Sequence, residues 1–428
     1  MDQVKLSRAF RTAELPISDY ISQIESYFSS REPSVLAFVS EENRFGRLRT
    51  EAEALQSHFP DPEKRPPLFG VLVGVKDIIH VDGFTTQAGS RLPAKELQGV
   101  EAECVTKLKK AGALILGKTI TTEFAFFSPG VTRNPHNPEH TPGGSSSGSA
   151  AAVGAGLCPL ALGTQTIGSI IRPAAFCGAV ALKPTYDRIS RDGVIPLSPS
   201  LDHLGFFTPD IATAKLAAPS LCKRWNDSIP LNRRPTLGIP EGPYLAFASD
   251  YTLACFRSIC GSLAEAGYEL HRVPVMDDYP QIRVRHDIIM AAEVARVHKA
   301  WFEKYADLYS SKLTDFIRQG QSITDVRLKN AFAAREDFRA EIRRAMIDNN
   351  IDLWIAPSTV DVAPKGLDTT GYPALNLPWT QAGLPVVNLP AGKNPDGLPY
   401  GLQVIGNWYK DESLLIWAED LEKVLATR

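Results

Sequence analysis

Apolar residues follow two alternating patterns along the chain: short continuous runs, and longer segments in which they recur every three or four positions. A continuous run predicts a buried strand, and the longer spacing predicts an amphipathic helix. Strands are expected at residues 36–39, 69–79, 113–117, 160–162, 236–240, 269–275, 352–357 and 402–406. Helices are expected at residues 17–29, 41–55, 101–111, 150–157, 250–266, 286–305, 325–349 and 411–426. Ser18 can cap the first helix, and alternation of strands with helices is typical of α/β proteins.

One stretch, residues 141–172, departs from both patterns because it is rich in glycine, serine and alanine. It opens with TPGGSSSGS and closes with GTQTIGSIIR, so Ser145 and Ser169 each stand among small neighbours. A flexible Gly/Ser linker would continue as polar coil, whereas a predicted helix and a predicted strand separate these serines. We therefore expect two exposed hydroxyls on turns at the ends of rigid elements. Such hydroxyls suit nucleophilic catalysis, and turns that serve only packing are the alternative.

Lys76 lies within the apolar run 69–79, in the sequence GVKDII. Most lysines are surface residues, so one interpretation is an edge-strand lysine that extends its amine to water. Burial disfavours the ammonium form, so a buried lysine can instead become a neutral base. The residues alone leave both interpretations open.

The composition is ordinary for a soluble globular protein, with 44% hydrophobic and 22% charged residues in a chain of 428. A formal net charge of −2 gives no argument for a nucleic acid or an acidic membrane as a partner. The first residues contain no apolar signal segment, and nowhere do about 18 apolar residues run uninterrupted. We therefore expect a cytoplasmic protein with no nucleic-acid or membrane partner.

No metal or cofactor is expected from the sequence. The six cysteines form no CxxC pair and stand mostly among apolar residues, which favours buried reduced thiols over disulfides or zinc. The eight histidines show no metal-binding spacing. The Gly-rich stretch also lacks the GxxxxGK(S/T) order of a phosphate-binding loop.

Three separated blocks of sequence together resemble one family. They are Gly74–Asp77, the stretch from Gly143 through GTQTIGSI and RPAAFCG to Thr185, and Gly383–Pro385 with Gly397–Gln403. In this order they are similar to the amidase signature family of serine hydrolases, over roughly residues 65 to 425. The resemblance implies one large α/β domain with a central mixed sheet covered by helices on both faces. Within this amidase domain, 1–428, we expect an N-terminal helical segment (1–60), a catalytic core with the signature (65–210), a helical and substrate-side region (211–350) and a C-terminal core (351–428).

The resemblance implies a catalytic triad. Ser169 matches the nucleophile, Ser145 the bridging serine and Lys76 the base, so that Ser145 would pass the proton of Ser169 to neutral Lys76. In the family the bridging serine follows a cis peptide bond, which here would join Gly144 to Ser145. Ser146 would orient the serine pair.

The resemblance also implies an oxyanion hole and suggests where substrate binds. The hole would consist of the backbone amides of Thr166, Ile167, Gly168 and Ser169. Aromatic and basic side chains near the serine block either line a substrate pocket or belong to the core and surface. The candidates for pocket lining are Phe127, Arg133 and Arg172.

Three residues depart from the family pattern. Gln165 stands where many members have Asp, and Arg172 is displaced by one position, which we regard as variation within the family. Ile167 stands where Gly is usual, and a β-branched residue resists the positive φ angles that Gly allows. We therefore expect Ile167 to affect the geometry of the oxyanion hole and the size of the acyl pocket.

The function that the resemblance implies is hydrolysis of a carboxamide or a urea-like C–N bond in a small molecule, through an acyl-enzyme on Ser169. One alternative is a glutaminase-type subunit of an amidotransferase complex, which the absence of a basic patch does not favour. Another is a catalytically silent binding protein with the amidase fold, suggested only by Ile167. A homodimer is a candidate assembly.

Overall fold

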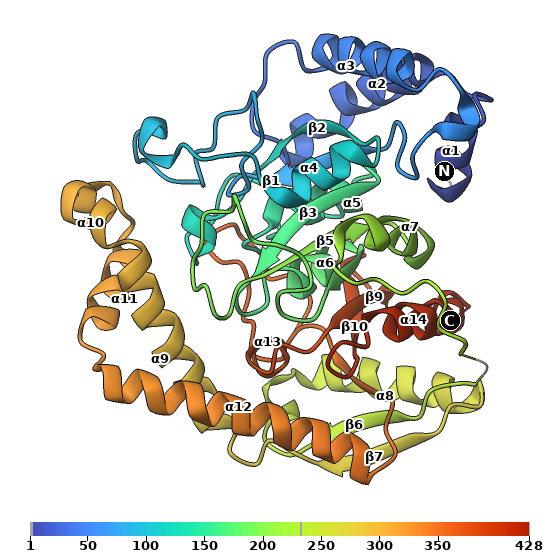
Figure 1. Ribbon diagram of the computed structural model, residues 1–428. Helices are drawn as coiled ribbons and strands as arrows, with labels where there is room; N and C mark the ends of the chain where they lie inside the picture. The colour runs from blue at the N-terminus through green and yellow to red at the C-terminus, as the bar shows by residue number, and fades with distance from the viewer. Residues whose placement is uncertain (1–2, 232, 428) are drawn as a thin grey trace.

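The computed structural model describes residues 3–231 and 233–427. Within this part of the chain, ten strands form one sheet in the order β2-β1-β3-β5-β4-β9-β10-β8-β6-β7 (Figure 1). The strands are β1 (Leu72–Lys76), β2 (Leu114–Thr119), β3 (Leu160–Gln165), β4 (Val180–Lys183), β5 (His203–Thr208), β6 (Leu237–Glu241), β7 (Leu270–Pro274), β8 (Leu353–Pro357), β9 (Val386–Lys393) and β10 (Pro399–Ile405).

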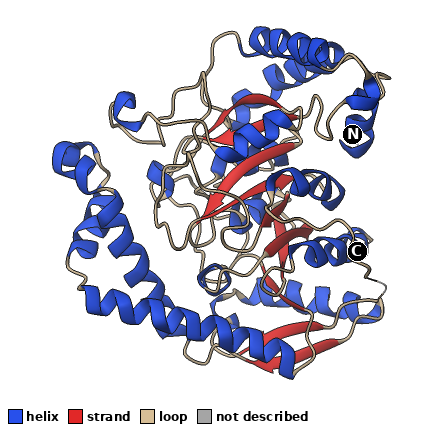
Figure 2. Cartoon of the chain, viewed as in Figure 1, coloured by secondary structure: helices blue, strands red, loops and turns tan. Residues whose placement is uncertain are grey.

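Helices cover both faces of the sheet (Figure 2), which confirms the expected α/β domain. In the described part of the chain the α-helices are α1 (Gln3–Arg11), α2 (Ile17–Val35), α3 (Arg44–His58), α4 (Glu103–Lys110), α5 (Ser147–Gly154), α6 (Ile171–Cys177), α7 (Ile211–Leu221), α8 (Asp250–Glu265), α9 (Tyr279–Val297), α10 (Lys299–Tyr305), α11 (Ser311–Gln321), α12 (Asp325–Asp348), α13 (Leu377–Gln381) and α14 (Asp411–Ala426).

The sheet is mixed, as expected. At one end β1 pairs in parallel with β2 and β3, and at the other β6 pairs in parallel with β7 and β8. The strands between these two groups run antiparallel to their neighbours. Every residue of β1, β2, β3, β4, β5 and β8 is buried. Burial on both faces explains why several strands appear in the sequence as continuous apolar runs.

Two predictions near the N-terminus are wrong. Residues 36–39 form no strand, only an isolated bridge at Phe38, because the backbone of Leu36 turns left-handed as the C-cap of α2. Helix α2 begins after Pro16, and Ser18 does not cap it.

Several other elements differ from the prediction or were not predicted. The helix expected at residues 286–305 is two helices, α9 and α10, which meet at His298. Strands β5 and β9 contain buried polar residues, His203 and Asn388, so neither reads as an apolar run. Helix α11 likewise lies in a segment without an assigned element in the sequence.

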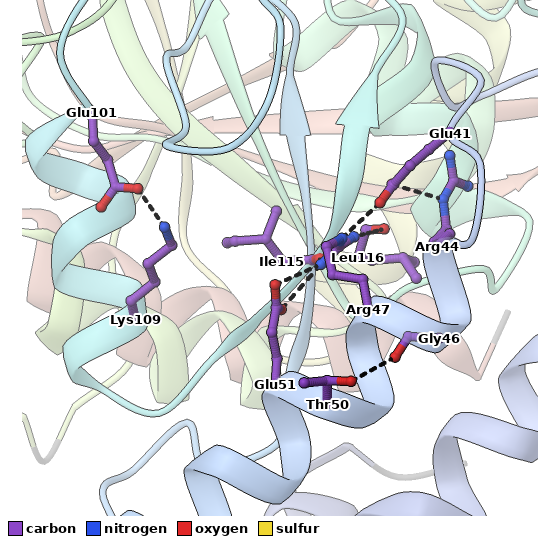
Figure 3. Close-up of polar contacts among 10 residues, drawn as sticks. All are labelled: Glu41, Arg44, Gly46, Arg47, Thr50, Glu51, Glu101, Lys109, Ile115 and Leu116. Atoms are coloured by element: carbon purple, nitrogen blue, oxygen red, sulfur yellow. Dashed lines mark hydrogen bonds and ion pairs between the residues drawn. The ribbon is translucent and has the colours of Figure 1, made fainter.

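Strand β2 lies at the edge of the sheet, and α3 protects that edge (Figure 3). The guanidinium of Arg47 donates to the carbonyls of Ile115 and Leu116, at 3.0 and 3.3 Å. Glu41 and Glu51 in turn accept hydrogen bonds from Arg47. Because an uncovered edge strand can pair with another chain, these contacts give the charged segment 41–55 a structural role rather than leaving it as a solvated helix.

Helices α9 to α12 form an arm beside the sheet (Figure 1). Helix α9 packs against α11, α12 and α13, and the apolar stripe of α12 (Phe338, Ile342 and Met346) is buried. Gln381 of α13 donates to the Ile282 carbonyl of α9 at 2.8 Å. The arm is therefore joined to α13, which contacts the serine-bearing segment described next.

Candidate active site

Lys76 is the last residue of β1, which lies between β2 and β3, and its side chain is fully buried. Its Nζ donates to the Oγ of Ser145 and to the Oγ1 of Thr164, both at 2.8 Å. Burial lowers the pKa of Lys76 well below its usual range, and the charge of Asp202 opposes that shift. The side chain is thus a buried amine and not the surface ammonium of an edge strand.

The segment before α5 carries Ser145, and backbone contacts hold it in place. The Ser145 carbonyl accepts from the Thr122 amide and from the Thr121 hydroxyl, both at 3.2 Å. A cis peptide bond joins Gly144 to Ser145. The Ser146 hydroxyl donates to the carbonyl of Thr164 and accepts from its amide, at 3.1 and 3.2 Å. Ser146 therefore ties the serine segment to β3, at the residue whose hydroxyl contacts Lys76.

Arg172 does not line either of the two cavities described below, because its guanidinium is buried beneath the serine segment. It donates to the carbonyls of Gly144 and Gly371 and, at 3.2 Å, to the Thr370 hydroxyl. Burial lowers the pKa of Arg172 to about 9. The displaced arginine thus joins two loops that are far apart in sequence.

Ser169 lies in the turn between β3 and α6 and is 9% exposed, while Ser145 is 2% exposed. The expectation of two exposed hydroxyls is therefore wrong, because neighbouring loops cover both serines. Within residues 3–231 and 233–427, no hydrogen bond joins Ser169 to Ser145, and no protein group accepts from the amides of Ile167, Gly168 or Ser169. These three amides are free to bind a ligand oxygen.

Gln165 accounts for the first departure from the family pattern. Its Oε1 accepts from the amides of Ile170 and Ile171, at 2.8 and 3.0 Å, at the start of α6. Its Nε2 donates to the Thr380 hydroxyl of α13 at 2.8 Å. The carbonyl oxygen of the side chain thus accepts as a carboxylate oxygen would, and the amide adds a donor that a carboxylate lacks.

Ile167 adopts no left-handed backbone conformation, so the strain expected from a β-branched residue is absent. Its carbonyl accepts from the Thr380 hydroxyl at 2.6 Å. Gly168, in contrast, has no room for a side chain, because a Cβ would lie 2.5 Å from the Asn376 side chain. The close approach that needs glycine is at position 168, one residue after the family's usual glycine.

Two cavities lie on either side of this turn. The larger, of about 560 Å³, is lined by Ile167, Phe127 and Tyr372 and by two charged residues of α9, Arg283 and Asp287; we call it the Ile167 cavity. The smaller, of about 290 Å³, is lined by residues that include Thr164, Thr166, Arg191, Asp192 and Asp202; we call it the Thr166 cavity.

Arg133 lines neither cavity, in contrast to Phe127. Its side chain is exposed, and its Nη1 lies 3.5 Å from the Pro138 carbonyl. Of these two residues of one loop, the aromatic residue therefore lines the Ile167 cavity and the basic residue is exposed to solvent.

Two further polar residues at this site have no strong sequence signal. Thr164 accepts from Lys76, and the carboxylate of Asp202 accepts from the Thr166 hydroxyl at 2.6 Å. Burial raises the pKa of Asp202 to about 6. Asp202 follows a loop of no distinctive composition, and only the sheet brings it close to Thr166, so spacing along the chain could not have identified it.

Within the described residues, no group of three or more His, Cys, Asp or Glu side chains could hold a metal ion. The cysteines of these residues are free thiols, four of them buried. No helix in the described ranges is both long and apolar enough to cross a membrane.

The model of the family described as Amidase matches residues 29–249 and 255–415, which is most of the chain. The chain belongs to the Amidase family. Among its curated relatives is a glutamyl-tRNA(Gln) amidotransferase subunit of Synechococcus sp. (strain RCC307), 31% identical over 478 residues, covering 99% of this chain and 97% of the relative. The subunit of the same name from Symbiobacterium thermophilum is also 31% identical, over 99% of this chain and 96% of its own length.

Solved structures of similar chains agree with this family assignment. An amidase fold described as "Crystal structure of amidase" has a TM-score of 0.89 and 29% identity, and covers 99% of both chains. A second, from work on "an s-triazine catabolic enzyme", has a TM-score of 0.87 and 27% identity, and covers 100% of this chain and 98% of the other. The similarity therefore extends over almost the whole of this Amidase family member and of its relatives.

Proposed function

We propose that the protein is an amidohydrolase that cleaves a carboxamide or urea-like C–N bond of a small molecule through an acyl-enzyme on Ser169. The observation that carries this proposal is the hydrogen bond from the buried amine of Lys76 to Ser145. A lysine whose pKa is well below its usual range is a base near neutral pH. In this proposal Ser145 relays the proton of Ser169 to Lys76.

In the proposed reaction the Oγ of Ser169 attacks the amide carbon. Its proton passes to Ser145, and the proton of Ser145 passes to Lys76. The tetrahedral intermediate then collapses as the C–N bond breaks, and the leaving nitrogen takes a proton back along the same path. Water repeats the sequence on the ester, which releases the acid and restores Ser169.

The oxyanion of the intermediate needs hydrogen-bond donors that are already in place. The amides of Ile167, Gly168 and Ser169 are proposed donors because no protein acceptor occupies them. The amide of Thr166 was also expected from the sequence and lies in the same turn. The hydrogen bond from Thr380 to the Ile167 carbonyl fixes the orientation of the peptide that follows Ile167, and hence of the Gly168 amide.

The curated relatives support a second candidate, a glutaminase-type subunit of an amidotransferase complex, because they carry the name of such a subunit. The same triad chemistry would serve both candidates. The two differ in the substrate and in the need for a partner. A protein that hydrolyses glutamine only after addition of a co-purified subunit would favour the second, and turnover of other small amides by the isolated chain would favour the first.

A catalytically silent binding protein was suggested only by strain at Ile167. That reason is weakened, since the backbone of Ile167 is not left-handed. A fluorophosphonate probe separates this silent candidate from the two catalytic ones, because it reacts with activated serines only. We expect one adduct per chain, located at Ser169 by peptide mass spectrometry and absent from Ser169→Ala. A folded wild-type protein that forms no adduct would favour the silent protein.

A further inference from the structure

Asp202 makes three hydrogen bonds at the edge of the Thr166 cavity. Its Oδ1 accepts from the Thr166 hydroxyl at 2.6 Å. Its Oδ2 accepts from the amides of Leu197 and Ser198, at 2.9 and 3.0 Å. Both carboxylate oxygens are thus used, one toward the serine-bearing turn and one toward the loop that precedes β5.

That loop is itself held by the arm. Glu293 of α9 accepts from the hydroxyl of Ser198 and from the amide and hydroxyl of Ser200. Arg335 of α12 donates to the Ser200 carbonyl at 3.0 Å. Asp202 therefore stands on a loop that two helices fix, and not on a free surface segment.

The position of Asp202 relates it to Lys76. Thr164, in β3, and Thr166, in the bend that directly follows this strand, both line the Thr166 cavity. Thr164 contacts the amine of Lys76, and Thr166 contacts the carboxylate of Asp202. Asp202 is also the charged group that opposes the effect of burial on the pKa of Lys76.

Other titratable groups near Asp202 include one arginine and two histidines. Arg191, in the loop before β5, lowers the pKa of Asp202, although burial outweighs it. His203 follows Asp202 in β5, and burial lowers its pKa well below its usual range. His286 of α9 faces Thr166, and burial lowers its pKa to about 3. Both histidines are therefore neutral near pH 7, and Asp202 is the carboxylate whose charge raises the pKa of Lys76.

We propose that Asp202 is a positioning residue of the reaction: through Thr166 it fixes the turn that carries Ser169, and its charge stabilises the ammonium formed when Lys76 accepts a proton. This inference rests on the proposed function. A lysine that gains a proton in a buried site needs a nearby negative charge. The carboxylate supplies that charge without touching the substrate.

Asp202→Asn removes the negative charge and keeps the hydrogen bonds of residue 202. The Asn oxygen can accept from the Leu197 and Ser198 amides, and its NH₂ group can donate to the Thr166 hydroxyl, which is able to accept. Thr166→Val does the reverse in alkaline solution, where Asp202 is ionised, because it removes the link and leaves the charge. Asp192→Asn is the matched control: Asp192 lines the same cavity, is exposed, and accepts only from Ser190 among the described side chains.

The experiment measures the rate constant of fluorophosphonate labelling at Ser169 from about pH 5 to pH 10 for each variant. The rate should rise with pH as Lys76 loses its proton. In Asp202→Asn the midpoint of this rise should move to lower pH by about one unit, because loss of a nearby opposite charge lowers the pKa of a base. Thr166→Val should label more slowly on the alkaline plateau, where Asp202 is ionised, and Asp192→Asn should match the wild type.

Asp202→Asn with the wild-type midpoint would overturn the electrostatic part of the inference. Thr166→Val with the wild-type plateau rate would overturn the positioning part, and it carries the test alone if Asp202→Asn does not fold. In both cases the wild type is still labelled at Ser169, so the proposed function stands. A wild type that is not labelled would instead overturn the proposed function and this inference with it.

Discussion

The Nζ atom of Lys76 lies 2.8 Å from the Oγ atom of Ser145, although 69 residues separate them in the chain. The sheet creates this contact, because β1 and β3 are parallel neighbours and Ser146 ties the serine segment to β3. Both side chains are buried, so they form hydrogen bonds with protein groups and not with bulk water. The predictions below follow from this contact and from the groups around it.

Activity should depend on deprotonation of Lys76. Because the base must be neutral to accept a proton, kcat/KM for any amide substrate should fall about tenfold per pH unit below the pKa of Lys76. That pKa lies well below the usual lysine value, so activity should persist near neutral pH. Lys76→Arg should be inactive, because a guanidinium does not lose its proton. A flat profile from about pH 5 to pH 8 would argue against Lys76 as the titrating base.

The free energy of unfolding should also depend on the protonation of Lys76, because burial in the folded protein disfavours its charged form. The pKa of Lys76 is lower in the folded protein, so between that value and the ordinary lysine pKa of about 10.4 the unfolded chain binds a proton that the folded protein does not. The destabilisation of the folded protein by Lys76 is therefore at its full size below the pKa that Lys76 has in the folded protein. It decreases as the pH rises toward about 10.4. Lys76→Met should raise the free energy of unfolding at neutral pH, with a gain that shrinks in alkaline solution.

Lys118→Met is the matched control for that stability measurement. Lys118 is also buried in the neighbouring strand, but its Nζ lies 2.8 Å from the carboxylate of Asp77. Its removal leaves a buried charge unpaired, which typically costs about 3–5 kcal/mol. Denaturant unfolding should thus show a higher free energy of unfolding for Lys76→Met and a lower one for Lys118→Met. If both variants are less stable than the wild type, Lys76 does not destabilise the folded protein.

Some of this site could be predicted from the sequence, and some could not. Lys76, Ser145 and Ser169 stand in recognisable local patterns, and the structure brings Lys76 to Ser145. Thr164 stands within the recognised block, but only the fold shows that its hydroxyl contacts Lys76, and no local pattern marks Asp202, which reaches the site through Thr166. The strain expected at Ile167 is absent because its backbone is not left-handed, and the position with no room for a side chain is Gly168, next to Asn376.

The fold shows the same limit. Fully buried strands such as β1 and β8 appear as apolar runs and were predictable. Strand β9 was not, because Asn388 is buried within it and hydrogen-bonds to Ser358 and to the Ala179 carbonyl. A polar residue whose partners lie on other elements interrupts the local pattern even though it belongs to the core.

Arg172 should matter for stability and activity together. Replacement by Met leaves the buried carbonyl of Gly144 and the partly buried carbonyl of Gly371 without this donor, at a typical cost of about 1–3 kcal/mol for a buried unsatisfied group. The loop that carries Ser145 would also lose an anchor, so kcat should fall. Arg133→Met serves as the control because Arg133 is exposed. Equal unfolding free energies for the two variants would contradict this role for Arg172.

Ile167 should limit the size of the acyl group. Its side chain lines the Ile167 cavity next to the proposed oxyanion hole. Ile167→Gly should raise kcat/KM for an aryl amide relative to a short aliphatic amide, by roughly 1–3 kcal/mol of discrimination. An equal change for both substrates would mean that Ile167 does not restrict the cavity. A loss for both would mean that its packing against the turn is required.

The nucleophilic role of Ser169 is the central claim, and substrate turnover by Ser169→Ala tests it most directly. The variant lacks one hydroxyl that makes no hydrogen bond to Ser145, so we expect it to fold with unchanged thermal stability. Its kcat for an amide that the wild type hydrolyses should fall by several orders of magnitude, as is usual when a nucleophile is removed. A folded Ser169→Ala protein that keeps more than about one-hundredth of the wild-type kcat would contradict the account.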